Sequence, residues 1–224
     1  MREARRLALQ RPMHIQPLFV IEARQELHQL IRNYPLATTI TSVGGTVEVN
    51  LLPLELRDLG LHGHLCGHVA RTHSLWTQGS EALEVTVIFQ SPNAYISPRW
   101  YVNGQRSGRN APSWNYVAVQ AQGQLRFTED AGWMAAHLAS LTATQEATRA
   151  QPWSTTDISP DFLSETTKRL VGFEIEIEAM TGKKFLSQQR TEADRKSLVQ
   201  HLALEASLSA RVVATLIKPS RHFD

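Results

Sequence analysis

The chain has 224 residues, 42% of them hydrophobic and 20% charged, a composition that favours a folded protein over a disordered one. No apolar run approaches the roughly 20 residues that a transmembrane helix needs, and no apolar signal-peptide segment follows the first residues. The net charge is +2. Residues 1–12 hold four arginines against one acid, so the rest of the chain carries −1, which weakens an interpretation as a DNA-binding protein.

Cys66 is the only cysteine of the chain, so no disulfide can form within one copy. A single cysteine is typical of proteins in a reducing compartment. The sequence therefore predicts a cytoplasmic location.

The first predicted element is a helix from Glu22 to Asn33, which Pro35 ends. A hairpin follows: the β-branched run Ala37 to Ser42 is joined by two glycines to the run Thr46 to Leu52. Apolar and β-branched runs predict four further strands: His62 to Ala70, Leu83 to Phe89, Trp114 to Ala121 and Gln124 to Thr128. A turn at Gln122-Gly123 is predicted to join the last two. Hairpins without long helices between them indicate an antiparallel barrel or sandwich.

A polar loop over Asn103 to Pro112 is predicted before the strand that begins at Trp114. After them, Asp130 is a predicted N-cap of a helix to about Leu141, and Ser159 or Asp161 of a helix to Leu170. The alternation of apolar and acidic residues in Gly172 to Ala179 predicts a strand, which Gly182 turns towards Lys183 to Gln188. Two helices end the chain, Glu192 to Leu204 and Leu208 to Ile217, with Ser207 as a possible cap.

Three histidines and the cysteine alternate in the strand around Cys66, so His62, His64, Cys66 and His68 share one face. Imidazole and thiolate bind zinc or copper, but ligands two residues apart on a flat strand point in parallel and rarely converge on one ion. A thiolate–imidazole nucleophile is a further reading. Solvated or hydrogen-bonded histidines and a core cysteine are the favoured interpretation.

Two aromatic segments beside prolines repeat a pattern around the polar loop, Ser97 to Tyr101 and Pro112 to Tyr116. They can border a site that stacks on a planar ring, or Trp100 and Trp114 can plug a barrel end. Arg71 follows a strand and can clamp a phosphate through its guanidinium, with a surface ion pair as the alternative.

Several ordered segments together resemble the PaiB family, described as FMN-binding negative transcriptional regulators. The segments from Met13 onward are Gly63-His64, Gly67 to Arg71, Gly79 to Leu83, Val87 to Pro92, Ala94 to Pro98, Pro112 to Tyr116, Val171 to Ile177, Leu186 to Gln188 and Glu192 to Arg195. The resemblance implies a mainly β fold with added helices, a six-stranded antiparallel FMN-binding split barrel that works as a homodimer.

The resemblance also implies the flavin-binding residues. Arg71 would hold the FMN phosphate, and the other residues would border or close the site: His68, Ser97, Trp100, Ser113, Trp114, Asn115, Tyr116, Ser187 and Gln188. The chain departs from the family pattern at Asn50, at the turn Thr72-His73-Ser74 and at Gln189, where the family is expected to carry His, Ala-Asn-Pro and Asn.

The predicted organisation has three parts: a basic extension over residues 1–12, a split barrel over residues 13–190, and a helical segment over residues 191–224.

An FMN-binding regulator is the first functional interpretation. A flavin-dependent oxidoreductase with an external reductant is the second, and a split barrel that has lost FMN is the third. The terminal helix pair presents mostly apolar groups, so packing or dimer contacts are favoured over DNA reading.

Overall fold

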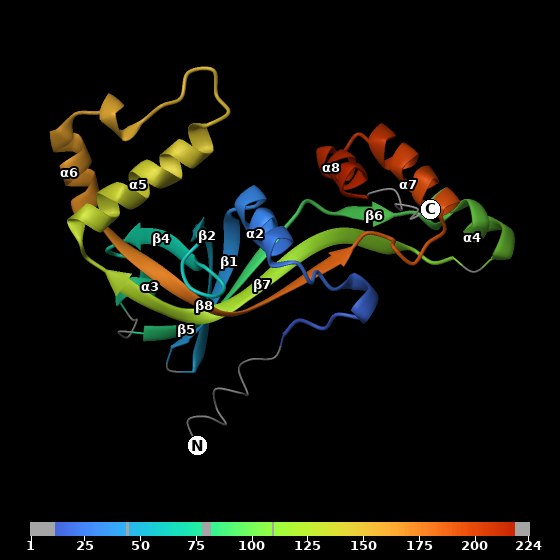
Figure 1. Cartoon of the computed structure of the whole chain (residues 1–224), viewed down its shortest axis with the longest axis horizontal. Helices are drawn as coiled ribbons and strands as arrows, with labels where there is room; N and C mark the ends of the chain where they lie inside the picture. The colour runs from blue at the N-terminus through green and yellow to red at the C-terminus, as the bar shows by residue number, and fades with distance from the viewer. Residues whose placement is uncertain (1–11, 44, 78–81, 109, 218–224) are drawn as a thin grey trace. The chain divides into compact units, whose positions relative to one another are not determined.

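A computed structural model describes residues 12–43, 45–77, 82–108 and 110–217. Apart from Pro12, the predicted N-terminal extension therefore lies outside the described residues, as does the end of the predicted C-terminal segment. The fold is mainly antiparallel β with helices added at the ends and between strands, which confirms the predicted fold class (Figure 1).

The strands follow one another in the hydrogen-bonded order β2-β1-β5-β7-β8-β4-β3, and β6 pairs with β7 outside this path. Their bounds are β1 Leu36–Val43, β2 Thr46–Pro53, β3 Glu55–Arg57, β4 His64–Ala70, β5 Ala82–Gln90, β6 Ala94–Ile96, β7 Ser113–Thr128 and β8 Leu170–Phe185. In the described chain β2 and β3 are the two ends of this path, so the sheet is not closed.

The number of strands differs from the six that the resemblance implies. Eight strands are present in the described residues, but β3 and β6 have three residues each. Every other strand has at least seven residues. The number of long strands thus equals the six that the resemblance implies, and the two short strands come from segments with no alternating pattern long enough to indicate a strand.

Two predicted turns are wrong, because Gly123 and Gly182 lie inside the continuous 16-residue strands β7 and β8. A Cβ at Gly123 would lie 1.9 Å from the carbonyl oxygen of Glu176, and one at Gly182 would lie 2.2 Å from Cδ2 of Leu27. Both glycines are thus required by close packing of neighbouring elements, one of the known reasons for glycine inside a strand.

The helices agree with the predictions in most places. Their bounds are α2 Arg24–Asn33, α3 Ser74–Thr77, α4 Val102–Ser107, α5 Ala131–Glu146, α6 Pro160–Lys168, α7 Glu192–Leu204 and α8 Leu208–Leu216, with short 3-10 turns at Pro17–Phe19, Pro98–Trp100 and Thr155–Asp157. Asp130, Ser159 and Ser207 accept backbone hydrogen bonds as N-caps of α5, α6 and α8, so these predicted helix starts are confirmed.

The predicted polar loop after Tyr101 is wrong in its first half, where α4 lies. The backbone N–H of Asn103 donates to the buried carboxylate of Asp194 at 2.8 Å, and its side-chain amide donates to Thr191 Oγ1 at 2.9 Å. These contacts to α7 are far apart in sequence. They order a segment whose local composition indicates only a loop.

The chain forms two compact units, each built from several sequence segments. Unit 1 comprises residues 1–30, 89–120 and 181–224, and unit 2 comprises residues 31–88 and 121–180. This division differs from a boundary at residue 190, which stays a prediction. In the described part of the chain, no helix is both long and apolar enough to cross a membrane.

Each unit has its own buried core. In unit 1, α7 and α8 pack on each other and α8 packs on β6 (Figure 1). In unit 2, the strands bury apolar side chains and α5 with α6 forms a connection between β7 and β8. Fully buried side chains of unit 1 include Phe89, Ile96, Tyr101, Leu198 and Leu202; those of unit 2 include Ile31, Leu54, Leu65, Phe173 and Ile175.

Candidate functional site

Arg71 lies in unit 2, directly after β4. Its backbone N–H donates to the carbonyl oxygen of Arg169 at 2.8 Å, which fixes the turn at the end of the strand. Its guanidinium donates through Nε to the carbonyl oxygen of Lys168 at 3.0 Å and through Nη1 to Glu129 Oε2 at 2.5 Å. The guanidinium is therefore held by two segments, one on each side of the α5–α6 connection.

A small pocket opens beside this guanidinium, with a volume of about 120 Å³. Whole small-molecule sites are typically larger, about 300–1,000 Å³. Its lining combines two cations, two hydroxyls, two carboxylates and three apolar side chains: Arg71, Lys168, Thr128, Thr167, Glu129, Asp130, Ala131, Met134 and Leu170. A pocket of this size suits one small polar group of a larger ligand.

His68 of β4 pairs with His137 of α5, whose Nε2 lies 3.1 Å from His68 Nδ1. On its other side, His137 Nδ1 lies 3.4 Å from Glu55 Oε2. Burial is the main cause that lowers the pKa of His137 to about 4, and the neighbouring His68 lowers it further. Burial also lowers the pKa of His68, so both rings are neutral at pH 7 and one of them donates to the other.

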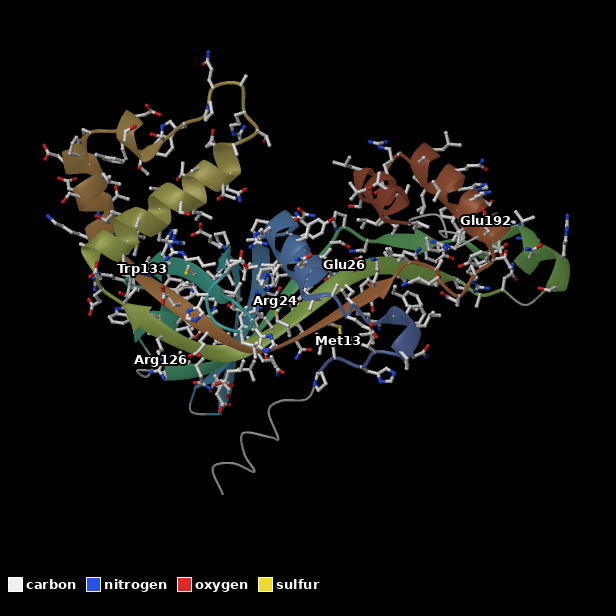
Figure 2. The ribbon with its side chains drawn as sticks, in the orientation of Figure 1. Met13, Arg24, Glu26, Arg126, Trp133 and Glu192 are labelled. Atoms are coloured by element: carbon white, nitrogen blue, oxygen red, sulfur yellow. The ribbon has the colours of Figure 1, made fainter. Side chains whose placement is uncertain are left out.

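Trp133 anchors the first turn of α5 to the sheet, where Figure 2 labels it. Its indole N–H donates to Glu174 Oε1 at 2.7 Å, and its ring fills the space that a side chain at Gly172 would occupy. The same carboxylate lies 3.8 Å from the Sγ of Cys66. Helix α5 is thus held on the strands by polar groups as well as by apolar contacts.

Cys66 is fully buried, and burial raises the pKa of its thiol to about 12. The thiol therefore stays protonated at neutral pH and does not act as a thiolate nucleophile. Among the described residues, no three His, Cys, Asp or Glu side chains are arranged to hold a metal ion. His62, His64 and His68 do not form such a group.

Three of the departures from the family pattern meet on one carboxylate. Asn50 Nδ2 donates to Glu48 Oε1 at 3.0 Å, Ser74 Oγ donates to the same oxygen at 2.5 Å, and His73 Nδ1 lies 3.9 Å from it. The hydrogen bond from Ser74 is the largest cause that lowers the pKa of Glu48; burial partly opposes it, and Asn50 and His73 lower the pKa further. The departures in β2 and in the turn after Arg71 are therefore one connected cluster.

In unit 1, aromatic rings follow one face of β6, β7 and β8. Tyr95 and Trp114 are paired across β6 and β7, both about half exposed, with ring centroids 6.0 Å apart. Tyr116 lies 6.1 Å from the ring of Phe185, and Lys183 Nζ lies over both rings. Trp114 is exposed, so it does not plug a barrel end. The exposed rings of Tyr95 and Trp114 suit contact with a planar ring.

Asn115 and Ser187 are buried together in unit 1. Ser187 Oγ donates to Asn115 Oδ1 at 3.1 Å, and within the described chain Asn115 Nδ2 has no hydrogen-bond partner. Ser187 has φ of 60°, a left-handed conformation that is unusual outside glycine. Gln188 holds this turn, since its Oε1 accepts from the backbone N–H of Leu186 at 2.7 Å.

Three other predicted residues of unit 1 have structural contacts. Ser97 caps the turn Pro98–Trp100, with Oγ accepting from the N–H of Arg99 at 3.3 Å. Trp100 stacks on His201 at 5.5 Å, and Ser113 Oγ lies 3.4 Å from the hydroxyl of Tyr101.

The structure thus divides the predicted site residues between the units. His68 and Arg71 lie at one end of β4, and Asn115 contacts Ser187. Glu129, Glu55 and His137 are not predicted from the sequence. Their roles come from contacts between elements far apart in the chain. The only local signal is the position of Glu129 one residue before the N-cap of α5.

Comparison with known proteins agrees with this architecture. Residues 13–179 match the model of the family described as "Putative FMN-binding domain". The protein of Bacillus subtilis named "Protease synthase and sporulation protein PAI 2" is 30% identical over 206 residues, which covers 92% of this chain and 97% of that protein.

Two solved structures share the fold at low sequence identity. An FAD and heme binding protein from Mycobacterium smegmatis is 14% identical, with a TM-score of 0.55 over 74% of this chain and 73% of that chain. A conserved hypothetical protein from Mycobacterium tuberculosis is 10% identical, with a TM-score of 0.56 over 77% of this chain and 91% of that chain.

The fold is that of the split-barrel flavin-binding proteins. With its match over residues 13–179, the chain belongs to the FMN-binding family, and it is a PaiB-like FMN-binding protein. The predicted family and the predicted cofactor are confirmed at this level.

The residues around Arg71 fit the phosphate of FMN under one condition. A guanidinium pairs well with a phosphate, and it already binds an oxygen anion here, the carboxylate of Glu129. Lys168 adds a second cation to the pocket lining. Because Glu129 Oε2 already accepts a hydrogen bond from Nη1, a phosphate that takes the same hydrogen of Nη1 displaces this carboxylate.

Proposed function

We propose that this protein is a homodimeric FMN-binding regulator of gene expression in which Arg71 binds the phosphate of the flavin. The observation that carries the phosphate assignment is the guanidinium of Arg71, which lines a small pocket and already holds an oxygen anion there. When bound, FMN supplies a ring that accepts and returns electrons. His68 lies three residues before Arg71, where a neutral imidazole can donate or accept one hydrogen bond.

The dimer is supported by an exposed apolar face of unit 2. Val47, Val49 and Leu51 alternate along β2 and are each about 60% exposed or more. Leu36 and Ile40 of β1 lie across from β2 residues on the same face. Because β2 ends the strand path, this face belongs to an edge of the sheet. An exposed apolar edge strand tends to pair or pack with another chain, and a second copy is the partner we propose.

Regulation is supported by the relative from Bacillus subtilis, whose name refers to protease synthesis and sporulation, and by the charge of unit 1. The sequence ranges of unit 1 contain 16 Lys and Arg against 7 Asp and Glu, a net charge of +9. Within its described residues the excess is still nine against five. A concentration of cations on one unit suits the phosphates of DNA. A cytoplasmic location is part of this proposal.

Absorption spectroscopy and DNA titration test the proposal. We expect the purified protein to retain flavin bands after loading with FMN and desalting, and to elute as a dimer. DNA binding is measured at several salt concentrations, with and without FMN, and is expected to weaken steeply as salt increases. A protein that binds FMN but no DNA even at low salt would exclude direct regulation and favour a flavin-dependent oxidoreductase.

A further inference from the structure

The connection between β7 and β8 begins and ends at Arg71. At its start, Glu129 accepts a hydrogen bond from Arg71 Nη1. At its end, Lys168 accepts one from Arg71 Nε and Arg169 accepts one from the backbone N–H of Arg71. The side chain of one residue thus ties the two ends of the segment 129–169, which carries α5 and α6, to the end of β4.

The same guanidinium faces the pocket that suits a phosphate. Glu129 and Asp130 line this pocket together with Lys168. A phosphate monoester carries a charge of about −1.5 to −2 at pH 7. Two carboxylates beside it would repel it. Glu129, which ties the start of the α5–α6 connection to Arg71, therefore competes with a phosphate for the Arg71 pocket.

We propose that Glu129 is an internal competitor for the phosphate site, and that a bound phosphate displaces it and releases the start of the α5–α6 connection, at Glu129, from Arg71, while the contacts of Arg71 with Lys168 and Arg169 remain. This inference rests on the proposed function, because it takes Arg71 as the phosphate-binding residue. It adds a ligand-dependent change in the contacts of one defined segment and a residue that sets the affinity for phosphorylated flavin.

Replacing the carboxylate of Glu129 by a phosphate on Arg71 costs little free energy. The side chains of Arg71 and Glu129 are 37% and 56% exposed, and an exposed ion pair contributes little to stability. A phosphate pairs with a guanidinium through two oxygens and carries more charge than one carboxylate. The phosphate therefore binds Arg71 more strongly than Glu129 does. The connection keeps other contacts with the sheet, such as the hydrogen bond from Trp133 to Glu174.

Riboflavin provides the matched ligand, because it has the ring and the sugar alcohol of FMN without the phosphate. Glu129 competes only with the phosphate, so removing its charge changes the affinity for FMN and leaves that for riboflavin unchanged. Glu165→Gln is the matched control variant, because Glu165 is an exposed acid of α6 outside the pocket lining. It removes the same charge from the same segment.

The experiment measures flavin affinity by fluorescence quenching and amide hydrogen exchange over residues 129–134 and 165–169. We expect Glu129→Gln to bind FMN about two- to fivefold more tightly than the wild type, the ratio that the loss of an exposed ion pair corresponds to. Glu165→Gln is expected to match the wild type. FMN, and not riboflavin, is expected to increase exchange over residues 129–134, whereas exchange over residues 165–169 is expected to stay the same, because Arg71 keeps its contacts with Lys168 and Arg169.

The failures of the two proposals are distinguishable. If Arg71→Ala and Arg71→Lys bind FMN as tightly as the wild type, Arg71 does not hold the phosphate and both proposals are wrong. If these variants bind FMN weakly while Glu129→Gln binds it as the wild type does, only the competition is wrong. Unchanged exchange over residues 129–134 on FMN binding would overturn the release of the start of the connection. Arg71→Lys keeps the charge, so its result stands where Arg71→Ala does not fold.

Discussion

The two compact units differ most in charge. The ranges of unit 1 carry a net charge of +9, from 16 basic and 7 acidic residues, whereas those of unit 2 carry −7, from 7 basic and 14 acidic residues. Their sum is the +2 of the chain, a value that describes neither unit. When the charges are counted along the sequence, most of the basic excess falls in residues 1–12. When they are counted by compact unit, the excess belongs to unit 1.

This difference shows that segments far apart in the sequence determine which charges act together. Unit 1 gathers cations from three separate ranges. Unit 2 is acidic as a whole, yet the phosphate site that we propose lies in it, because Arg71 is positioned by contacts within a few ångströms. Long-range attraction follows the charge of a unit, whereas a bound phosphate responds to the groups that touch it.

The largest expected effect is on the oligomeric state, and it compares an exposed leucine of unit 2 with one of unit 1. Leu51→Asp in unit 2 places a charge in the proposed dimer face, which we expect to convert the dimer to a monomer at micromolar concentration. An unpaired charge in a buried interface costs about 3–5 kcal/mol. Light scattering after gel filtration measures the mass. Leu208→Asp changes an equally exposed leucine of unit 1 and is expected to leave the mass unchanged; a monomer there would assign the interface to the other unit.

Acid is expected to destabilise unit 2 through His137. The pKa of His137 is about 4 in the folded protein, below the ordinary value of 6.5. Between these two pH values the unfolded chain takes up a proton that the folded chain does not, so the free energy of unfolding falls as the pH falls from 6.5 towards 4. The loss is roughly 3 kcal/mol. Urea unfolding at several pH values measures it. In His137→Gln the dependence between pH 6.5 and 4 should be shallower, and an unchanged dependence would assign the acid sensitivity to other groups.

Arg71→Ala is expected to weaken FMN binding by roughly 10- to 100-fold, since a hydrogen-bonded charge contributes about 1.5–3 kcal/mol. A fluorescence titration gives the affinity. The control is Arg126→Ala, an exposed arginine of β7 in the same acidic unit (Figure 2). If both variants lose affinity equally, the overall charge of unit 2 and not the Arg71 contact controls the binding of FMN.

The smallest expected effect concerns DNA. Arg99→Gln and Arg106→Gln, in unit 1, are each expected to reduce the slope of log affinity against log salt by about 1 if they contact phosphates. Arg149→Gln removes the same charge from unit 2 and should leave the slope as it is. Equal slopes in all three variants would exclude these two arginines from the contact with DNA.

Local signals in the sequence predicted most of the fold. The caps Asp130, Ser159 and Ser207 act within three residues of their own position, so they could be found without the structure. Glycine was ambiguous: Gly123 and Gly182 were interpreted as turns, but they allow close packing inside long strands. No local pattern distinguishes these uses, because the atoms that would clash belong to distant residues.

The candidate site could be predicted only in part for the same reason. Arg71 was found because it follows a strand and matches a family motif. Glu129 and His137 were not found, since each acts through a partner at least 58 residues away in the sequence. Contacts of this kind depend on how α5 packs on the strands, which composition and spacing do not determine.

The cluster on Glu48 couples substitutions at separate positions of the chain. Asn50 and Ser74 both donate to this carboxylate, so restoring the family residue at one position alone removes a donor from a half-buried acid and leaves the other in place. Such changes are epistatic: the effect of each depends on whether the others are present. A substitution at Asn50 therefore has one effect while Ser74 still donates to Glu48 and another when Ser74 is absent.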